Sequence, residues 1–332
     1  MLYIHGMGHY HPENVITNRF IEELDIGSSD EWIQERVGIL ARRTALSLEY
    51  IRATKNRDPR AAAEASCCTN ARSGALAAAM ALERASIGPE DIGLVISGSS
   101  ASDHLTPAEA ATVAGELGIE APCMDLNSAC STFGMQALWT SWMRPEKLPP
   151  FVLLVQPENL TRCVDYCDRR VAPLFGDGSS AAVVSATVPS TLRLADAFCD
   201  SAPSQWDKVR IPRFSHFNQN GNAVQGFAIR RSTDSLRRLQ ETYGTGPGSF
   251  VYIGHQANFG MLKTVCERCG IEEANHWFNV VDYGNTGCSS APAVLSQRWD
   301  NLREGDTLAM VLVGSGLSWA SLLFTVEGAA EE

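Results

Sequence analysis

The sequence has no uninterrupted apolar segment long enough to cross a membrane as a helix. Its most apolar late stretch, residues 308–326, is divided by Gly314-Ser-Gly316 and Ser318, which predicts two buried strands around a turn. The first residues, Met-Leu-Tyr-Ile-His-Gly, contain neither a basic segment nor a long apolar core, so we expect no signal peptide. These absences predict a cytoplasmic protein that does not span a membrane.

Positive charge is scarce, because 27 Lys and Arg residues stand against 38 Asp and Glu residues, for a net charge of −11. This balance argues against nucleic acid or an anionic membrane surface as a general partner, since both are themselves negative. A locally basic mouth of a binding site is still compatible with it. The candidate residues for such a mouth are Arg36, Arg42, Arg43, Arg162, Arg169 and Arg170.

Patterns for metal and phosphate binding are also missing. Cys266 and Cys269 form a single C-x-x-C pair with no second pair of ligands nearby, which argues against zinc. The glycine-rich segment 244–248 has no P-loop lysine after it. The ten cysteines belong to a long chain that we expect in the cytosol, which favours reduced thiols over a disulfide framework.

What the chain does contain is an ordinary globular composition, with 332 residues, 45% hydrophobic and 20% charged. That length allows one large or two small domains. Short β-rich runs alternate with helical runs, which predicts an α/β fold. The predicted strands are residues 94–97, 151–155, 250–253 and 307–313, and the predicted helices are residues 61–85, 131–143, 232–243 and 259–270.

The sequence also shows a faint internal duplication. The strand ending at Gly98 parallels the strand ending at Gly254, and the glycine turn at Gly176 parallels the turn at Gly314. The second pair has a shorter separation, which an insertion within residues 144–170 would explain. Chance similarity between small-residue turns accounts for the same matches, so the residues alone leave both explanations open.

Cys130 stands out among the cysteines as a candidate nucleophile. It follows the small-residue segment Asp125-Leu-Asn-Ser-Ala and precedes the predicted helix 131–143. Unpaired N–H groups and the helix dipole at a helix N-terminus favour a thiolate, which is a strong nucleophile toward thioesters. The other cysteines are expected to be buried and inert.

His255 and Asn285 also lie on turns that follow apolar runs. His255 comes directly after the predicted strand 250–253, and strand ends in α/β sheets are where functional groups tend to stand. A neutral imidazole there could donate its N–H to a thioester carbonyl that becomes an enolate. Asn285 lies between two glycines, a position that is also typical of an ordinary turn residue.

Several segments in this order resemble the ketosynthase III branch (β-ketoacyl-acyl-carrier-protein synthase III) of the thiolase-like superfamily. They are residues 29–39, 125–134, 175–178, 254–258, 283–288 and 314–319. The likeness runs from about Tyr3 to Val326. It implies a thiolase-like α/β fold, in which two similar βαβαβαββ halves, residues 1–188 and 189–332, form a five-layered αβαβα arrangement.

The resemblance also implies a role for each candidate residue. Cys130 would carry an acyl group, His255 and Asn285 would stabilise an enolate, and the backbone N–H groups of Cys130 and Ser315 would bind the oxyanion. The substrates would be acyl-CoA or phosphopantetheine-linked thioesters, with no metal and no permanently bound cofactor. The residues expected to hold CoA or phosphopantetheine are Trp32, Arg36, Arg162 and Asn258. A solvated charge is an equally good interpretation of Arg162.

Three departures from the family bear on the substrate. Gly260 stands where the fatty-acid-starting members carry an arginine that contacts CoA phosphate, which predicts weaker use of CoA. Thr106 stands where an aromatic residue of the partner subunit often closes the acyl pocket, which predicts room for a longer or branched chain. Residues 48–65 form an apparent insertion, expected near the pocket or the carrier-docking mouth. Together these departures predict a ketosynthase of specialised metabolism.

The leading hypothesis is a homodimer that performs decarboxylative Claisen condensation of a Cys130-bound acyl group with a malonyl-type or β-ketoacyl thioester on an acyl carrier protein. The alternative joins two longer (β-keto)acyl chains and cyclises the product to a pyrone, resorcinol or cyclohexanedione, with Glu109 as a candidate base. Simple acyl transfer to an alcohol or amine is a third hypothesis. A non-catalytic partner subunit is the most distant one, and the intact Cys130, His255 and Asn285 oppose it.

Overall fold

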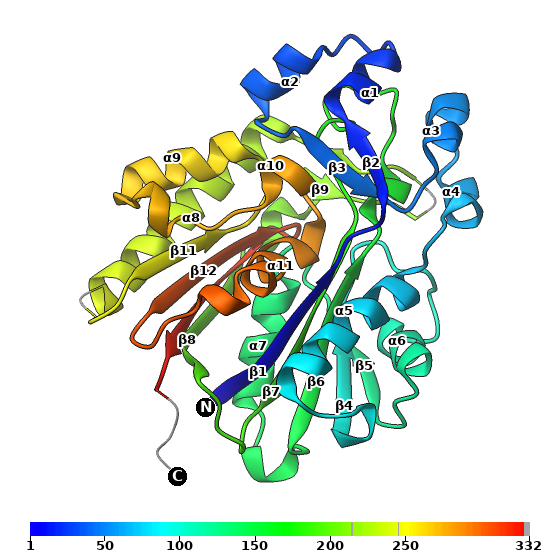
Figure 1. Ribbon diagram of the computed structural model, residues 1–332. Helices are drawn as coiled ribbons and strands as arrows, with labels where there is room; N and C mark the ends of the chain where they lie inside the picture. The colour runs from blue at the N-terminus through cyan, green and yellow to red at the C-terminus, as the bar shows by residue number, and fades with distance from the viewer. Residues whose placement is uncertain (214, 245, 329–332) are drawn as a thin grey trace.

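The computed structural model describes residues 1–213, 215–244 and 246–328. Its centre is a nine-stranded mixed sheet with the strand order β11-β12-β13-β8-β1-β7-β6-β4-β5 (Figure 1). The strands are β1 (Leu2–Tyr10), β4 (Ile92–Ser97), β5 (Cys123–Asp125), β6 (Phe151–Glu158), β7 (Gly178–Ser185), β8 (Leu192–Ser201), β11 (Phe250–Gly254), β12 (Thr307–Gly314) and β13 (Ser318–Val326). The α/β fold class is therefore confirmed, as is the prediction of two strands around a turn in residues 308–326.

The sheet has two parts with the same pairing pattern. In the first, β1 pairs antiparallel with β7, β7 antiparallel with β6, and β6 parallel with β4. In the second, β8 pairs antiparallel with β13, β13 antiparallel with β12, and β12 parallel with β11. A short antiparallel pairing of β1 with β8, from Leu2 to Ile4, joins the two parts into one sheet. The predicted boundary between residues 188 and 189 would fall between β7 and β8 and stays a prediction.

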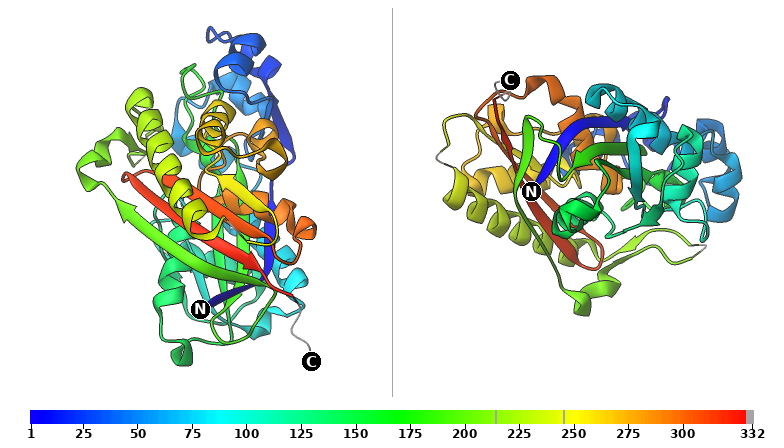
Figure 2. Two further views of the ribbon diagram at one scale, coloured as in Figure 1. Left: turned by 90° about the vertical axis from the view of Figure 1, so that its left-hand side faces the viewer. Right: turned by 90° about the horizontal axis from the view of Figure 1, so that it is seen from below.

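Helices cover both sides of the sheet and also lie between its two parts (Figures 1 and 2). α5 packs on β1, β6 and β7 and against α6, whereas α8 packs on β12 and β13 and against α9. α7 and α11 each contact strands of both parts. These helices are α5 (Asn70–Ala85), α6 (Glu109–Leu117), α7 (Thr132–Trp142), α8 (Gly221–Tyr243), α9 (Phe259–Cys269) and α11 (Ser290–Gln297).

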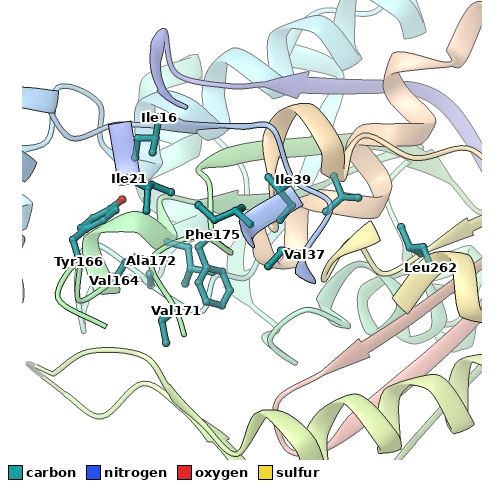
Figure 3. Close-up of a cluster of buried hydrophobic side chains, with 14 of the residues drawn as sticks. Ile16, Ile21, Val37, Ile39, Val164, Tyr166, Val171, Ala172, Phe175 and Leu262 are labelled. Carbon is teal, nitrogen blue, oxygen red and sulfur yellow. The ribbon is translucent and has the colours of Figure 1, made fainter. Parts of the chain in front are cut away.

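A smaller group of elements stands at the end of the sheet where the functional loops emerge. They are the hairpin of β2 (Asn14–Thr17) and β3 (Ala41–Thr44), α1 (Asn18–Glu23), α2 (Asp30–Arg36), α3 (Leu48–Thr54), α4 (Pro59–Ala65), α10 (Val280–Tyr283) and the pair β9 (Val209–Arg210) with β10 (Asn218–Gln219). A buried apolar cluster that includes Ile16, Ile39 and Phe175 connects these elements to α9 through Leu262 (Figure 3). Burial of this cluster keeps the loops around the site in place.

Two helix predictions differ from the structure. The predicted helix 61–85 is two helices, because Ser66 adopts an extended conformation and bridges to Leu46. Thr69 then begins α5 as an N-cap, with its hydroxyl accepting from the N–H of Arg72 at 3.1 Å. The predicted helix 232–243 is the second half of α8, which begins at Gly221.

Candidate active site

Three loops bring the predicted catalytic side chains to one cavity of about 570 Å³. Cys130 comes from the turn between β5 and α7, His255 from the end of β11, and Asn285 from the turn after α10. The two parts of the chain thus contribute different functional groups to the same cavity.

Cys130 lies in a tight turn immediately before α7. The side chain of Asn127 accepts a hydrogen bond from the N–H of Ala129 at 2.9 Å, and the hydroxyl of Thr132 accepts one from the N–H of Ser128 at 2.9 Å. Ala129 has a φ of +48°, a left-handed conformation that costs an alanine about 1–2 kcal/mol. The hydrogen bonds hold this conformation and so place Cys130 at the N-terminus of α7, as the sequence predicts.

The Cys130 thiol is protonated at neutral pH. Burial, with a smaller contribution from the negative charge of Glu158, raises the pKa of Cys130 to about 12. This differs from the prediction that the helix end favours a thiolate. The dipole of a helix contributes at most about 2 kcal/mol, and the loss of hydration outweighs it here. The proton therefore has to leave during acylation of the thiol.

His255 is held at the strand end by its backbone, since its N–H donates to the carbonyl of Val311 at 2.8 Å and its carbonyl accepts from the N–H of Ala257 at 2.9 Å. The side chain is almost completely buried, and its Nδ1 has no hydrogen-bond partner among the described residues. Burial lowers the pKa of His255 to about 4. The imidazole is therefore neutral at pH 7 and can donate one N–H.

Asn285 presents its amide group to the cavity. Its Oδ1 accepts from the N–H of Gly287 at 3.0 Å, which leaves the NH2 group available for a substrate. The backbone N–H of Asn285 donates to the carbonyl of Leu174 at 2.9 Å. Gly284 has a φ of +67°, and a Cβ at this position would lie 2.9 Å from that carbonyl oxygen. Only glycine fits this turn without a shift of its neighbours.

A third turn, between β12 and β13, lies directly against the Cys130 backbone. A Cβ at Gly314 would lie 3.0 Å from the nitrogen of Cys130, so the two backbones are in close contact. The positive φ of this turn, +133°, falls on Gly316, which leaves Ser315 in an ordinary conformation. The turn that carries Ser315 therefore lies beside the Cys130 backbone, and the role of its N–H in an oxyanion site stays a prediction.

Comparisons with known proteins agree with this geometry. A family model described as 3-oxoacyl-[acyl-carrier-protein (ACP)] synthase III matches residues 124–203, and its C-terminal counterpart matches residues 250–326. A β-ketoacyl-[acyl-carrier-protein] synthase III 1 from Bacillus cereus is 30% identical over 324 residues, which cover 96% of each chain. The chain belongs to the β-ketoacyl-acyl-carrier-protein synthase III family. It is therefore an acyltransferase of the ketosynthase type.

Solved structures show the same family fold. The 3-oxoacyl-[acyl-carrier-protein] synthase III of Aquifex aeolicus matches with a TM-score of 0.86 and 26% identity, over 98% of this chain and 100% of that chain. The priming β-ketosynthase of the R1128 polyketide biosynthetic pathway matches with a TM-score of 0.82 and 27% identity, over 99% and 97% of the two chains. The fold is therefore that of the ketosynthase III family along essentially the whole chain.

Three of the four residues predicted to hold the thioester carrier line the cavity: Trp32, Arg36 and Asn258. Asn258 also begins α9, with its Oδ1 accepting from the N–H of Met261 at 2.8 Å. The guanidinium of Arg169 lies over the Trp32 ring, 4.2 Å from its centroid. Arg170 and Arg210 also line the cavity, so two of the six predicted arginines, Arg36 and Arg170, belong to its basic mouth.

Arg162, the fourth residue, does not line the cavity. It is buried, and its guanidinium forms a salt bridge with Asp103 and donates to the carbonyls of Ala101 at 2.7 Å and Asn159 at 3.2 Å. Because these contacts use its donors inside the protein, the placement does not fit a contact with CoA. Arg42 is likewise buried and donates to the carbonyl of Pro173.

Thr106 and Glu109 also lie away from the cavity of their own chain. Thr106 belongs to the exposed loop 102–107. Glu109 is buried at the start of α6, where it accepts from the side chain of Asn70 and from the N–H of Asp103, both at 3.3 Å. Burial, with the nearby charge of Asp103, raises the pKa of Glu109 to about 7. Glu109 therefore holds the base of the loop.

The apparent insertion 48–65 forms α3 and α4 and does not line the cavity. It packs instead on the segment after β6, because the side chain of Asn56 donates to the carbonyls of Arg162 and Val164, both at 2.9 Å. His216 contacts the carbonyl of Asn56 at 2.7 Å. The insertion thus supports the outer side of the cavity wall, one layer behind the residues that line it.

Sequence reasoning missed one side of the cavity and one residue beneath it. Residues 209–211 and 217–225, from β9 to the first turns of α8, form much of the cavity wall. No sequence pattern marks them, because they are short strands and an uncharged helix start. The missed residue is Glu158, which lies fully buried near Cys130. The sequence gives no sign of this, because a glutamate at a strand end is typical of a solvated surface.

No helix in residues 1–213, 215–244 and 246–328 is long and apolar enough to cross a membrane. In the same part of the chain, no group of three or more His, Cys, Asp or Glu side chains is arranged to hold a metal ion.

Proposed function

We propose that this protein catalyses decarboxylative Claisen condensation between an acyl group on Cys130 and a malonyl-type thioester. The observation that carries the proposal is the convergence of a thiol, a neutral imidazole and a carboxamide NH2 group on one cavity. A thiol forms the acyl-enzyme, and the other two groups are the uncharged donors that an enolate oxygen requires.

In the first half-reaction, the sulfur of Cys130 attacks the carbonyl carbon of the donor thioester. A carbon–sulfur bond to Cys130 forms, the carbon–sulfur bond of the donor breaks, and the proton of Cys130 leaves with the donor thiol. The backbone N–H groups of Cys130 and Ser315 bind the oxyanion of the tetrahedral intermediate. Because one thioester replaces another, the exchange is close to neutral in energy.

In the second half-reaction, the malonyl-type thioester loses CO2 and becomes an enolate, whose oxygen accepts hydrogen bonds from His255 and Asn285. The enolate carbon attacks the acyl carbonyl, so a carbon–carbon bond forms and the bond to Cys130 breaks. An asparagine suits this position because an aspartate would repel the developing negative charge. The thiolate of Cys130 then takes up a proton and returns to its resting state.

We propose an acyl carrier protein, rather than free CoA, as the preferred donor. Gly260 places no cation at this position of α9, and a Cβ there would lie 3.5 Å from Oδ1 of Asn258. Arg169 already covers one face of Trp32, where an adenine ring would otherwise stack. A phosphopantetheine arm has no adenine, so it loses neither contact.

We propose that the acyl chain is longer than acetyl, and the size and lining of the cavity are the reasons. Its volume of about 570 Å³ is shared by the carrier arm and the acyl group, and a two-carbon group fills a small part of it. Much of the wall is apolar, which favours a hydrocarbon chain. The apolar lining residues are Leu160, Leu174, Phe175, Ile211, Phe217, Met261 and Val313.

We propose a homodimer as the working unit. β5 is the last strand of the sheet, so its outer edge has unpaired backbone groups that suit a second copy of the same strand. Two large apolar side chains in this part of the sequence are exposed: Met124 lies on β5, and Leu105 lies on the loop 102–107. Pairing of two copies at this edge would cover both.

The position of Glu109 bears on the cyclising alternative. That reaction calls for a base near the acyl chain, and Glu109 is instead buried against Asn70 and Asp103 of its own chain. Within its own chain Glu109 therefore does not line the cavity, and its role as a base stays a prediction.

Intact-protein mass spectrometry with a panel of acyl-CoA and acyl-carrier donors tests the proposal. A competent donor should add one acyl mass, located on the Cys130 peptide. The Cys130→Ser variant should lose this adduct, whereas Cys288→Ser, a matched change at another buried cysteine, should keep it. Addition of malonyl-carrier should then release CO2 and a β-ketoacyl product. A stable acyl group on Cys288, or acylation without a β-ketoacyl product, would contradict the proposal.

A further inference from the structure

Glu158 ends β6 and is fully buried beneath the cavity. None of the salt bridges in the described part of the chain involves it. A carboxylate taken out of water without a cation carries a desolvation penalty of several kcal/mol. Hydrogen bonds therefore supply most of the stabilisation of the Glu158 carboxylate, and their partners show which loops it holds in place.

The hydrogen bonds of Glu158 come from two loops. Oε1 accepts from the hydroxyl of Ser99 at 3.3 Å and from the N–H of Ser100 at 3.1 Å. Oε2 accepts from the N–H of Ser100 at 3.2 Å and from the N–H of Cys288 at 3.3 Å. Every one of these partners is a donor, which fits an ionised carboxylate.

Both loops lead to catalytic groups. The carbonyl of Ser99 accepts from the side chain of Asn127 at 2.8 Å, and Asn127 in turn holds the turn that carries Cys130. Cys288 follows Gly287, whose N–H donates to Oδ1 of Asn285. Glu158 thus connects the support of the nucleophile with the support of an enolate donor. Packing is tight, because a Cβ at Gly287 would lie 2.8 Å from Oε2 of Glu158.

We propose that Glu158 is a positioning residue for both half-reactions and that its negative charge adds to the effect of burial in disfavouring the thiolate of Cys130. The positioning part of this inference rests on the proposed condensation. The electrostatic part does not, since it concerns the free enzyme. A neutral thiol reacts slowly with peroxides and alkylating agents, so the charge adds to the protection that burial gives the nucleophile.

The titratable groups around Glu158 respond in the direction that this proposal requires. They are Cys130 before α7, Cys288 in the 3₁₀ turn Gly287–Ser289, and Cys163 at the end of the 3₁₀ turn Leu160–Cys163. Burial is the main cause of the raised pKa of each thiol, and the charge of Glu158 raises each further. Burial raises the pKa of Glu158 itself, and its hydrogen bonds from Ser100 and Cys288 oppose this shift.

The Glu158→Gln variant tests the proposal, because glutamine keeps the shape of the side chain and removes the charge. The rate of Cys130 alkylation by iodoacetamide, followed by peptide mass against pH, measures the thiolate fraction. Loss of a like charge in a buried site lowers a pKa by about one unit or more, so alkylation at pH 8 should be roughly tenfold faster. Condensation should become slower, because glutamine keeps only one of the two acceptor oxygens that hold the Ser100 and Cys288 loops.

Asp177→Asn is the matched control. Asp177 is also a fully buried carboxylate that accepts from backbone N–H groups, those of Ala45 and Thr161, both at 2.7 Å. Its charge does not contribute to the raised pKa of Cys130. The alkylation profile of Cys130 should therefore stay unchanged in this variant, whatever happens to its stability.

Unchanged or slower alkylation in folded Glu158→Gln, judged by circular dichroism, would overturn the electrostatic part. Faster alkylation with unchanged condensation would overturn the positioning part. If Glu158→Gln does not fold, Glu158→Asp is the second variant, because it keeps the charge and shortens the side chain. Alkylation of Cys130 should then stay the same while the condensation rate falls. Changed alkylation with an unchanged condensation rate would refute the proposal. If the wild-type enzyme is acylated but never condenses, the proposed function fails while the alkylation result still stands.

Discussion

Restoring a cation at position 260 should shift the donor preference of this enzyme toward CoA. Gly260 is exposed in the first turn of α9, and a Cβ built there would lie 3.5 Å from Oδ1 of Asn258, with no other described atom within 4 Å apart from its chain neighbours and the helix backbone. An arginine therefore fits without moving the backbone, and its side chain starts beside Asn258 at the mouth of the cavity.

The size of the effect follows from one added phosphate contact. A hydrogen bond to a charged group contributes about 1.5–3 kcal/mol when it is shielded from water. The side chain at position 260 is exposed, so screening reduces this to about 1.4 kcal/mol, which is a tenfold change in affinity. We expect KM for an acyl-CoA donor to fall roughly tenfold in Gly260→Arg, with little change for the same acyl group on pantetheine without a nucleotide.

Gly260→Ala is the control, because it adds a Cβ and the higher helix propensity of alanine, about 1 kcal/mol, without a charge. Acylation rates with acyl-CoA and acyl-pantetheine, measured at low and high salt, separate the two effects. An equal gain with both donors, or the same gain in Gly260→Ala, would refute the phosphate contact. If wild-type enzyme already prefers acetyl-CoA over carrier-bound longer chains, both Gly260 and Thr106 have been misinterpreted.

Four further predictions follow from the same structure. Alanine at His255 or Asn285 should lower CO2 release from malonyl-carrier about 10²–10³-fold while intact mass still shows acylation of Cys130, and loss of acylation would contradict these roles. Burial lowers the pKa of His11 to about 3, so between pH 6.5 and 3 the unfolded chain binds a proton that the native state excludes. The free energy of unfolding should therefore decrease as the pH is lowered through this range. In urea titrations, His11→Phe should show a smaller decrease. Aspartate at Met124, on the open edge of β5, should leave a monomer with reduced activity in sedimentation velocity, and an active wild-type monomer of 36.0 kDa would refute the dimer. Thr106→Phe should shorten the longest chain accepted in a panel of acyl donors, and an unchanged panel would mean that this loop does not reach an acyl pocket.

The sequence alone was sufficient to find the three central candidates, because each lies in a short segment that resembles a motif of the family. Cys130, His255 and Asn285 each follow an apolar run and lie among small residues, and both features depend on local backbone preferences. The same local rules located β4, β6, β11 and β12, and the two strands within residues 308–326. The fold class could be predicted for the same reason, because it follows from the order of helices and strands along the chain.

Helix limits were less predictable, because contacts between distant segments decide them. An alanine-rich stretch predicts one helix over residues 61–85, yet the bridge between Ser66 and Leu46 interrupts it. The start of α8 at Gly221 could not be predicted either, because its first turns contain glycine and asparagine and are held by the cavity wall that they form. In both places tertiary contacts outweigh the intrinsic preference of the residues.

Only the tertiary structure decided how each charge is solvated. Arg162 and Glu158 are charged residues that local rules place at the surface, and both are buried by segments far away in the sequence. The pKa of Cys130 depends on the same kind of long-range burial, which is why a helix end that favours a thiolate holds a thiol instead. The sequence determined which reactive groups the protein has and on which turns they lie, because those are local properties. Their protonation and their neighbours depend on which distant segments exclude water from them, and folding alone decides that.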